Sequence, residues 1–375
     1  MDIGGRLVVG DDGYTTIADA WDAAADGDTV YVHSSYDASA AGESFPIELD
    51  CREKQVTLTG GHPSASVIDA GSTDETVLEI VGAGNGDYQN NPIVKDLKIV
   101  GGGLGLRLRA APFASFQNLV FYQTGSHAVL IDSHPDSGTF GTNWYNLQAW
   151  NCGGDGIRMV RSAEPHGTTL WGCRFTANRG AGVRFRGTTC KMIGGTSQLN
   201  YDYGVESRGG YANQISGAYI EGNARGNDFP VELYARHTDG LTIESCYFHG
   251  INPRGANHNH DRVQRAVNVH DCEKLSVRDC VARRYGDGFL ATFGCTDVDV
   301  HVSSHHLEEA DLFARDPTAN GNARARSDGV ILPTDLSAID GAYEYDHGYH
   351  IGSDGTEGYA IWRNDSWRLS ETVLL

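Results

Sequence analysis

The chain has little lysine, few cysteines and no long hydrophobic run. Five lysines stand against 24 arginines, and 16 glutamates against 33 aspartates, so that the net charge is −20 at pH 7. A nucleic-acid partner would call for a basic stripe, which such a surface does not offer. No run of about 18 apolar residues occurs, so insertion into a membrane is not expected. Acidic, lysine-poor surfaces are typical of proteins in strong brine, where salt screens self-repulsion, and the composition therefore favours a halophilic source.

Cysteine usage and the N-terminus indicate where the protein is made. Eight cysteines among 375 residues are too few for a disulfide scaffold, and no Cys-x-x-Cys motif is present. We expect these thiols to be free and mostly buried. The first residues, MDIGGRLVVGDD, lack the charged and then apolar segment of a secretion signal. This favours a protein that is assembled inside the cell, and a mature start after processing is the alternative.

One short helix is predicted near the N-terminus, ahead of a strand at Thr29–His33. Thr16 and Asp19 form a weak capping box at its start, and Gly27 is the expected stop. Because only strands are predicted after this helix, we interpret it as a lid over a stack of strands. Four apolar residues have the i, i+3, i+4, i+7 spacing of a one-faced helix: Ile17, Ala20, Trp21 and Ala24.

A template of the form apolar-x-apolar-x-polar-Cys recurs along the middle of the chain. Each copy is followed by a turn and a short alternating strand, and the repeat period lies in the low-to-mid twenties. Such a period without intervening helices predicts a right-handed parallel β-helix, which is an all-β solenoid. We expect the cysteines of the four strong copies to form one inward ladder. These copies are Leu147–Cys152, Thr168–Cys173, Leu241–Cys246 and Leu275–Cys280, with weaker copies at Leu119–Thr124 and Ile215–Ile220.

The stretch YTTIADAWDAAADGDTVYV (Tyr14–Val32), followed by coils rich in glycine and asparagine, resembles the pectate-lyase-like superfamily of β-helix proteins, which includes viral tailspikes. The resemblance covers the chain from about Gly10 to Arg315. It implies a single-stranded right-handed parallel β-helix. It implies little about activity, because this fold carries many functions.

Four regions are predicted along the chain. Residues 1–35 hold the first strand and the capping helix, 36–315 the β-helix, 316–329 a linker without strand periodicity, and 330–375 a small C-terminal β module. In the last region AIWRNDSWRLS, with Trp362 and Trp367, resembles the end module of tail-fibre and spike proteins. It predicts a hairpin across Asn364 and Asp365. An ordinary cap that shields the last coil is the alternative.

The alternating strands supply the candidate catalytic residues. The residue after the first apolar position is expected to point outward, which places Arg158, Arg184, Glu206 and Glu232 in one column. Successive coils stack at about 4.8 Å. Two carboxylates about 5 Å apart suit a retaining glycosidase, so Glu206 and Glu232 are the predicted catalytic pair. A surface charge ladder, in which Arg184 pairs with Glu206, is the alternative.

Motifs of the enzymes in this superfamily are incomplete here. His249-Gly250 matches the His-Gly of polygalacturonase-like hydrolases, but no Arg-x-Lys follows it. Asp-Asp occurs only at Asp11-Asp12, ahead of the capping helix. The resemblance therefore carries over neither lyase nor hydrolase activity.

A long insertion and several aromatic residues supply candidate ligand-binding residues. INPRGANHNHDR (Ile251–Arg262) brings two imidazoles and a carboxylate close together, but their spacing on a loop lacks the scaffold of a strong metal motif. No metal or cofactor is therefore predicted. Loops on a rigid solenoid often carry recognition, and outward aromatic rings can stack on sugars. The predicted ligand-binding residues are Arg158, Arg184, Trp171, Tyr203, His258 and His260.

Three functions are compatible with the sequence. The first is a virion spike or tail-fibre protein of a halophile virus, which binds a host surface glycan or glycoprotein, contacts other virion proteins and forms a homotrimer. The second is a polysaccharide lyase or glycoside hydrolase, either secreted or part of a tailspike. The third is a non-catalytic structural or decoration protein of the virion, in which the solenoid is a spacer.

Overall fold

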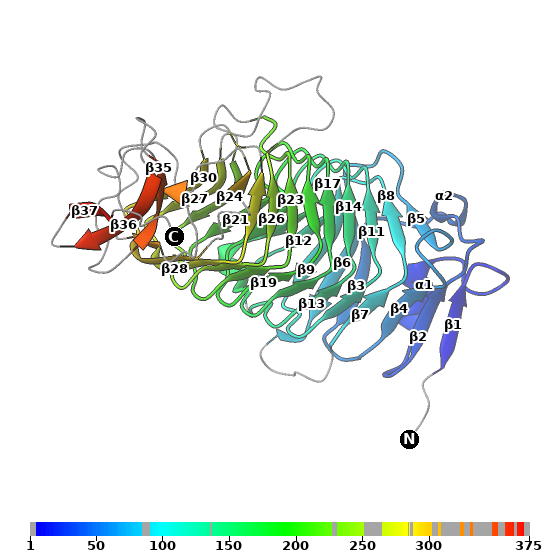
Figure 1. Cartoon of the computed structure of the whole chain (residues 1–375). Coiled ribbons are helices and arrows are strands. Elements are labelled where there is room, and N and C mark those ends of the chain that lie inside the picture. Colours follow the sequence, from blue (N-terminus) through cyan, green and yellow to red (C-terminus); the bar gives the residue numbers. More distant parts are fainter. Residues whose placement is uncertain are drawn as a thin grey trace. The chain divides into compact units, whose positions relative to one another are not determined.

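The computed structural model of the chain is built mainly of short β-strands wound into coils (Figure 1). It describes residues 5–84, 91–135, 137–226, 231–250, 265–283, 285 and 288–301, and beyond these only the short strands β32 to β37. The chain forms two compact units, residues 1–196 and 197–375. Parallel sheets dominate both units, and the predicted fold class, an all-β parallel β-helix, is confirmed.

In the first unit every complete coil contributes one strand to each of three parallel sheets. The first sheet contains β1 (Arg6–Val9), β2 (Thr29–Val32), β4 (Thr57–Gly60), β7 (Ile93–Lys95), β10 (Ser115–Gln117), β13 (Asn143–Tyr145), β16 (Thr169–Trp171) and β19 (Lys191–Ile193). The second contains β5 (Val67–Asp69), β8 (Lys98–Val100), β11 (Val120–Tyr122), β14 (Gln148–Trp150) and β17 (Arg174–Thr176). The third contains β3 (Ile47–Cys51), β6 (Thr76–Gly82), β9 (Leu104–Arg109), β12 (Val129–Ile131), β15 (Ile157–Met159) and β18 (Val183–Phe185).

The second unit has the same three-sided coil, and β20 (Thr196–Gln198) lies where the two units divide. Its first sheet contains β22 (Gln214–Ser216), β25 (Thr242–Glu244), β28 (Glu273–Arg278), β31 (Thr296–His301) and β33 (Ala323–Ala325). Its second contains β23 (Tyr219–Glu221), β26 (Tyr247–His249), β29 (Val281–Arg283) and β32 (Leu307–Glu308). Its third contains β21 (Val205–Arg208), β24 (Val231–Arg236), β27 (Arg265–His270) and β30 (Gly288–Phe293).

A separate four-stranded sheet occupies the C-terminal part of the chain. It contains β34 (Ile331–Leu332), β35 (His347–Ile351), β36 (Glu357–Arg363) and β37 (Ser366–Ser370). β36 and β37 are antiparallel and pair Trp362 with Trp367, so the predicted hairpin is confirmed. β33 lies inside the predicted linker and pairs with β31. The four predicted regions stay predictions.

Single residues in the left-handed conformation turn the chain from the first sheet to the second. Asp96, Asn118 and Asn146 have φ values of 58°, 50° and 53°. Asn and Asp tolerate this region because their short polar side chains hydrogen-bond locally. Asn118 Nδ2 donates to Asp96 Oδ1 at 2.9 Å, and Asn146 Nδ2 donates to Asn118 Oδ1 at 3.0 Å. The corner is therefore a ladder of side-chain hydrogen bonds that holds successive coils in register.

The interior of each coil is filled by the inward residues of the alternating strands. Phe116 of β10 lies opposite Trp144 of β13, and their rings stack at 3.8 Å with an interplanar angle of 12°. Both side chains are fully buried, and Trp144 Nε1 donates to Thr142 Oγ1 at 3.1 Å. Equivalent positions thus stack like on like, which buries large rings without leaving a polar group unpaired.

All eight cysteines are buried and free, as predicted. The predicted single ladder is wrong in one member. Cys173, Cys246 and Cys280 each directly precede a second-sheet strand, whereas Cys152 follows the second-sheet strand β14 and so lies at a different corner. All three sheets of a coil share the same alternating pattern, so the letter template does not distinguish one corner from another.

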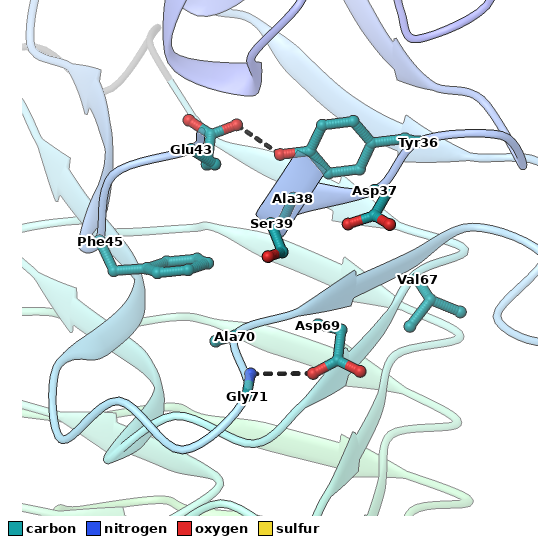
Figure 2. A pocket seen from close by; sticks show the side chains of 10 residues that line it. All are labelled: Tyr36, Asp37, Ala38, Ser39, Glu43, Phe45, Val67, Asp69, Ala70 and Gly71. Carbon is teal, nitrogen blue, oxygen red and sulfur yellow. Dashed lines mark hydrogen bonds between the residues drawn. The ribbon is translucent and has the colours of Figure 1, made fainter. Parts of the chain in front are cut away.

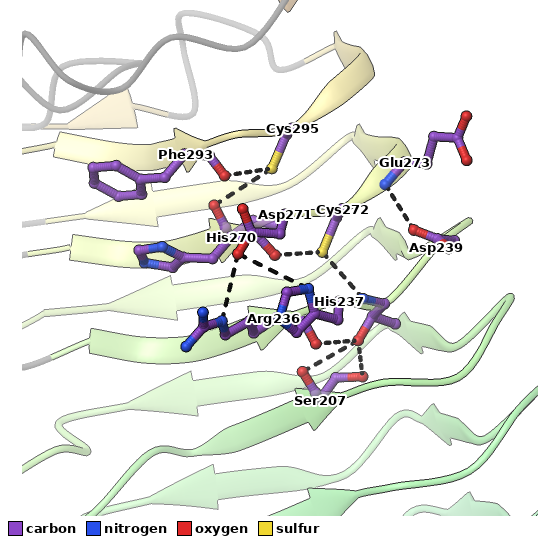
Figure 3. Close-up of polar contacts among 12 residues, drawn as sticks. Ser207, Arg236, His237, Asp239, His270, Asp271, Cys272, Glu273, Phe293 and Cys295 are labelled. Carbon is purple, nitrogen blue, oxygen red and sulfur yellow. Dashed lines mark hydrogen bonds and ion pairs between the residues drawn. The ribbon is translucent and has the colours of Figure 1, made fainter.

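A second group of cysteines, which the template missed, directly precedes first-sheet strands. It comprises Cys190 in the first unit and Cys272 and Cys295 in the second. Figure 3 shows the last two in neighbouring coils. Cys272 Sγ donates to His270 O at 3.2 Å, and Cys295 Sγ donates to Phe293 O at 3.5 Å. These buried thiols therefore satisfy backbone carbonyls at the corner.

The predicted helix is α1 (Ile17–Ala23), and its apolar face packs against β1, β2 and β3. Thr16 caps it by accepting a hydrogen bond from Asp19 N at 3.0 Å. The helix ends at Ala23, before the expected stop, and Lys54 Nζ donates to Ala24 O at 3.1 Å just beyond its end. A second short helix, α2 (Ala38–Ala41), and a 3₁₀ turn, η2 (Arg161–Ala163), are further helical elements.

A carboxylate from outside α1 completes its N-terminal cap. Glu43 accepts hydrogen bonds from Ile17 N at 2.6 Å and Ala18 N at 3.3 Å. Tyr36 OH also donates to Glu43 Oε2 at 2.5 Å (Figure 2). Burial, and then the hydrogen bond to Glu43, raise the pKa of Tyr36 well above its usual range. The lid is thus fixed by a charged residue that the sequence pattern of the helix does not contain.

Replacing Glu43 by alanine should loosen the lid. The change leaves two backbone amides of α1 and the phenol of Tyr36 without their acceptor, so the free energy of unfolding should fall by about 1.5–3 kcal/mol. Urea denaturation followed by tryptophan fluorescence would measure this loss. The matched control is Glu53→Ala at an exposed site; an equal loss in both variants would contradict the capping role.

Candidate functional site

The predicted catalytic pair does not have the expected geometry. Glu206 and Glu232 are both 0% exposed. Glu206 lies opposite Tyr234, two residues further along β24 than Glu232. A shift of β24 by two residues keeps the same side chains on each face, so the sequence pattern fits either register. In the structure Val205 pairs with Leu233, and Glu206 and Glu232 therefore do not lie opposite each other. A nucleophile must reach its substrate, so the structure does not favour a glycosidase centre at these two residues.

Glu232 is instead a buried carboxyl in the interior of the second unit. Asn223 donates to its Oε2 twice, from its backbone N at 3.1 Å and from Nδ2 at 2.6 Å. Among the described residues, neither Glu232 Oε1 nor the hydroxyl of Tyr285 has a hydrogen-bond partner. Burial raises the pKa of Glu232 to about 8. The Glu232 carboxyl is therefore mainly the neutral acid at pH 7. Glu206 has a different environment, because it forms a salt bridge with Arg208.

Arg158 and Arg184 lie opposite each other on the outer face of the third sheet, as predicted. A buried carboxylate joins them: Arg184 Nε lies 2.8 Å from Asp155 Oδ1, and Arg158 Nη1 lies 3.6 Å from Asp155 Oδ2. Ala181 N donates to Asp155 Oδ1 at 2.7 Å. The side chain of Arg158 is 48% exposed and that of Arg184 only 16%. Arg158 is therefore the cation that a ligand in solution can reach.

The imidazole of His127 borders the same carboxylate. His127 Nδ1 lies 3.4 Å from Asp155 Oδ2 and accepts a hydrogen bond from Asp155 N at 2.8 Å. Because Nδ1 is an acceptor there, the ring proton of the neutral imidazole is on Nε2. Burial lowers the pKa of His127. Neither His127 nor Asp155 was predicted from the sequence, where the only signal is the Gly-Asp-Gly that precedes β15.

Trp171 belongs to an exposed aromatic pair. Its ring lies parallel to that of Tyr145 on the neighbouring strand, with centroids 6.3 Å apart and an interplanar angle of 8°. Trp171 is 40% exposed and Tyr145 41%. We call these two rings the aromatic platform. Trp171 was predicted from the sequence but Tyr145 was not, because alternation alone does not distinguish an exposed ring from a covered one.

A groove of about 760 Å³ lies next to the aromatic platform. One of its lining residues, Asn146, directly follows Tyr145. We call it the amide groove, because planar amides and two aromatic rings form much of its lining. Lys98 also lines it, with Nζ 5.1 Å from the ring centre of Tyr122. The amides are those of Asn118, Asn146, Gln148 and Asn151, and the rings are those of Tyr122 and Trp150.

Tyr203 forms a second aromatic pair, in the second unit. Its ring stacks on Tyr234 at 4.9 Å, and the guanidinium of Arg208 lies 5.2 Å from the ring centre of Tyr234. Burial raises the pKa of Tyr203 to about 12. This pair is more covered than the aromatic platform. The other predicted ligand residues of this unit, His258 and His260, lie outside the described residues.

A second hollow, of about 770 Å³, lies beside the lid and is lined by three carboxylates (Figure 2). Each of them already accepts a hydrogen bond from a backbone amide. Asp37 accepts from Ala40 N, Asp69 from Gly71 N, and Glu43 from the start of α1. These carboxylates hold turns and helices, which leaves the hollow without an evident chemical role. Among the described residues, no three His, Cys, Asp or Glu side chains are placed to share a metal ion.

Comparisons with known proteins agree with the fold. The family model described as a right-handed beta helix region matches residues 136–305. No curated protein sequence matches the chain. In the described part of the chain, no helix is long and apolar enough to cross a membrane.

Several solved structures are similar to this chain at low sequence identity. A Streptomyces thermodiastaticus GH87 alpha-1,3-glucanase catalytic unit has a TM-score of 0.53 at 14% identity, over 91% of this chain and 63% of that chain. ORF18 of Geobacillus virus E2 has a TM-score of 0.45 at 13% identity, over 94% of this chain and 60% of that chain. The A-module of the Azotobacter vinelandii mannuronan C-5 epimerase AlgE6 has a TM-score of 0.43 at 16% identity, over 74% and 92%. The chain is a right-handed parallel β-helix protein.

Proposed function

We propose that the protein is a glycan-binding β-helix of the virion spike or tail-fibre kind, which recognises a surface glycan or glycoprotein of a halophilic host. The observation that carries this proposal is the aromatic platform. Two large rings, each about two-fifths exposed, lie parallel on adjacent coils of an otherwise acidic, polar chain. Exposed aromatic rings of this kind offer apolar faces on which a ligand can stack.

The chemistry of the platform and of the amide groove fits a saccharide. The C–H faces of a sugar ring are apolar and slightly positive, and they stack on the negative π-face of an aromatic ring. Sugar hydroxyls need paired donors and acceptors, which the side-chain amides of Asn146 and Gln148 provide. Arg158 lies on the third sheet, outside the lining of the groove, and is a separate exposed cation that can pair with an anionic group.

The further parts of the proposal rest on composition and on the resemblance of the chain ends to those of spike proteins. The acidic, lysine-poor surface supports work in brine. We propose a homotrimer in a virion, with other virion proteins as partners. Light scattering at several protein concentrations tests this part, and a monomer throughout would overturn it.

Replacing Trp171 by alanine should weaken glycan binding. Loss of a stacked ring removes about 1–1.5 kcal/mol, which corresponds to about a tenfold weaker affinity. The test is binding to host envelope polysaccharide at high salt, measured by calorimetry for the wild type, Trp171→Ala and Tyr145→Ala. Tyr211→Ala is the control, because this tyrosine is exposed but belongs to neither the platform nor the groove. Equal binding by all four proteins would remove the platform from the proposal, and no binding by the wild type would favour a structural role.

A further inference from the structure

Three chemically distinct groups follow one another on the outer face of the second sheet of the second unit. Glu221 of β23 lies opposite His249 of β26, and His249 lies opposite Arg283 of β29. Beside them Tyr219 stacks on Tyr247, with ring centres 5.2 Å apart and an interplanar angle of 5°. A carboxylate, an imidazole and a guanidinium thus occupy equivalent positions of three successive coils.

The carboxylate of Glu221 fixes the imidazole of His249. Glu221 Oε1 lies 3.0 Å from His249 Nδ1, and Glu221 Oε2 accepts a hydrogen bond from Tyr219 OH at 2.7 Å. A carboxylate oxygen only accepts, so Nδ1 must carry the proton and the lone pair of the neutral ring is on Nε2. The side chains of Glu221 and His249 are partly exposed, and Arg283 is exposed.

The pair at His127 has the opposite tautomer and therefore the opposite chemistry. His127 Nδ1 accepts a hydrogen bond from Asp155 N, so its Nε2 is protonated in the neutral ring. A neutral imidazole in that state presents a donor, not a base. Of these two carboxylate–imidazole pairs, only the one at His249 leaves the lone pair of the neutral ring on Nε2, and the His249 side chain is 21% exposed.

The side chains of Glu221, His249 and Arg283 together favour one class of reaction. Glycoside hydrolysis needs two carboxyl groups across the scissile bond, and Glu221 is the only carboxylate of this set, already bound on both oxygens. Acyl transfer to water needs one oriented general base and a positive group for the developing oxyanion, which are the roles that His249 and Arg283 can fill. No serine, threonine or cysteine belongs to the set, so water is the nucleophile.

We infer that Glu221, His249 and Arg283 form a hydrolytic centre that removes an ester substituent, such as an acetyl group, from a glycan. His249 Nε2 takes a proton from water as its oxygen bonds to the acyl carbon. Arg283 stabilises the negative oxygen. The bond from the acyl carbon to the sugar oxygen then breaks, and that oxygen takes the proton from the imidazolium. The products are a carboxylic acid and a free sugar hydroxyl. Glu221 acts as a positioning residue.

This inference rests on the proposed glycan binding, but it can be tested separately. The full chain is incubated at high salt with 4-nitrophenyl acetate and with acetylated xylan, and release of nitrophenol and of acetate is measured. We expect the wild type to release both. His249→Gln should lower kcat by at least about 100-fold, the usual effect of losing a general base. Glu221→Gln should lower kcat with little change in KM. His237→Gln is the matched control, because this exposed imidazole lies 3.9 Å from Asp271 but belongs to no candidate site.

A rescue experiment separates chemistry from misfolding. Imidazole added to His249→Ala should restore part of the lost rate, which a merely structural defect would not allow. Wild-type activity in His249→Gln, or no ester cleavage by the wild type above a buffer blank, would overturn the inference. If glycan binding persists in that case, the proposed function stands without the hydrolytic centre, and if binding is absent too, both fail.

Discussion

Replacing Glu232 by glutamine should remove a large part of the dependence of stability on pH. The carboxyl group is fully buried, and its pKa is raised from 4.5 to about 8 by burial. A raised pKa means that the folded protein holds a proton that the unfolded chain loses above pH 4.5. The stability that this bound proton contributes is therefore complete below about pH 4.5. As the pH rises from there to about 8, the free energy of unfolding falls by about 1.4 kcal/mol per pH unit.

The amide of glutamine resembles the neutral acid and keeps an acceptor for Asn223. We therefore expect Glu232→Gln to match the wild type near pH 5 and to exceed its free energy of unfolding by a few kcal/mol at pH 8. The measurement is the Tm of both proteins between pH 5 and 9 at constant salt. Glu273→Gln is the control, because the Glu273 carboxyl is exposed and points away from its neighbours in Figure 3. Identical slopes in the wild type and Glu232→Gln would refute the assignment.

Replacing Asp155 by alanine should cost about 3 kcal/mol of stability, because it leaves the partly buried guanidinium of Arg184 without this counter-charge. The carboxylate is 1% exposed and binds Arg184 Nε at 2.8 Å and Ala181 N at 2.7 Å. Gly180 packs so closely against Asp155 Oδ1 that no side chain fits there, and the site is built around this one carboxylate.

Guanidinium denaturation would measure the loss in Asp155→Ala. The control is Asp132→Asn on the same face of the first unit, where the carboxylate is 29% exposed and lies 3.6 Å from Arg107 Nε. That exposed ion pair should contribute less than about 1 kcal/mol. A loss below about 1 kcal/mol in Asp155→Ala would show that the cluster around Arg158 does not depend on the carboxylate.

The repeat and the alternation of the sequence were enough to predict the coil and its lid. The recurring apolar template predicts the stacked coils, and the i, i+3, i+4 spacing identifies Trp21 as part of the buried face of α1. Both signals are local, because they depend only on how a strand or a helix presents its side chains. Arg158 and Arg184 were placed correctly side by side for the same reason, since equal positions of adjacent coils stack.

The register between strands and the burial of individual polar side chains were decided only by the tertiary structure. Glu206 and Glu232 have the same local pattern, yet the pairing of Val205 with Leu233 offsets them, and the packing around both carboxyls closes them off from solvent. Cys152 was assigned to the wrong corner because three sheets share one pattern. The contacts of Glu221 with His249 and of Glu43 with α1 join residues more than twenty positions apart. Such contacts depend on which coils become neighbours, and a period-two pattern is the same for every strand of the stack.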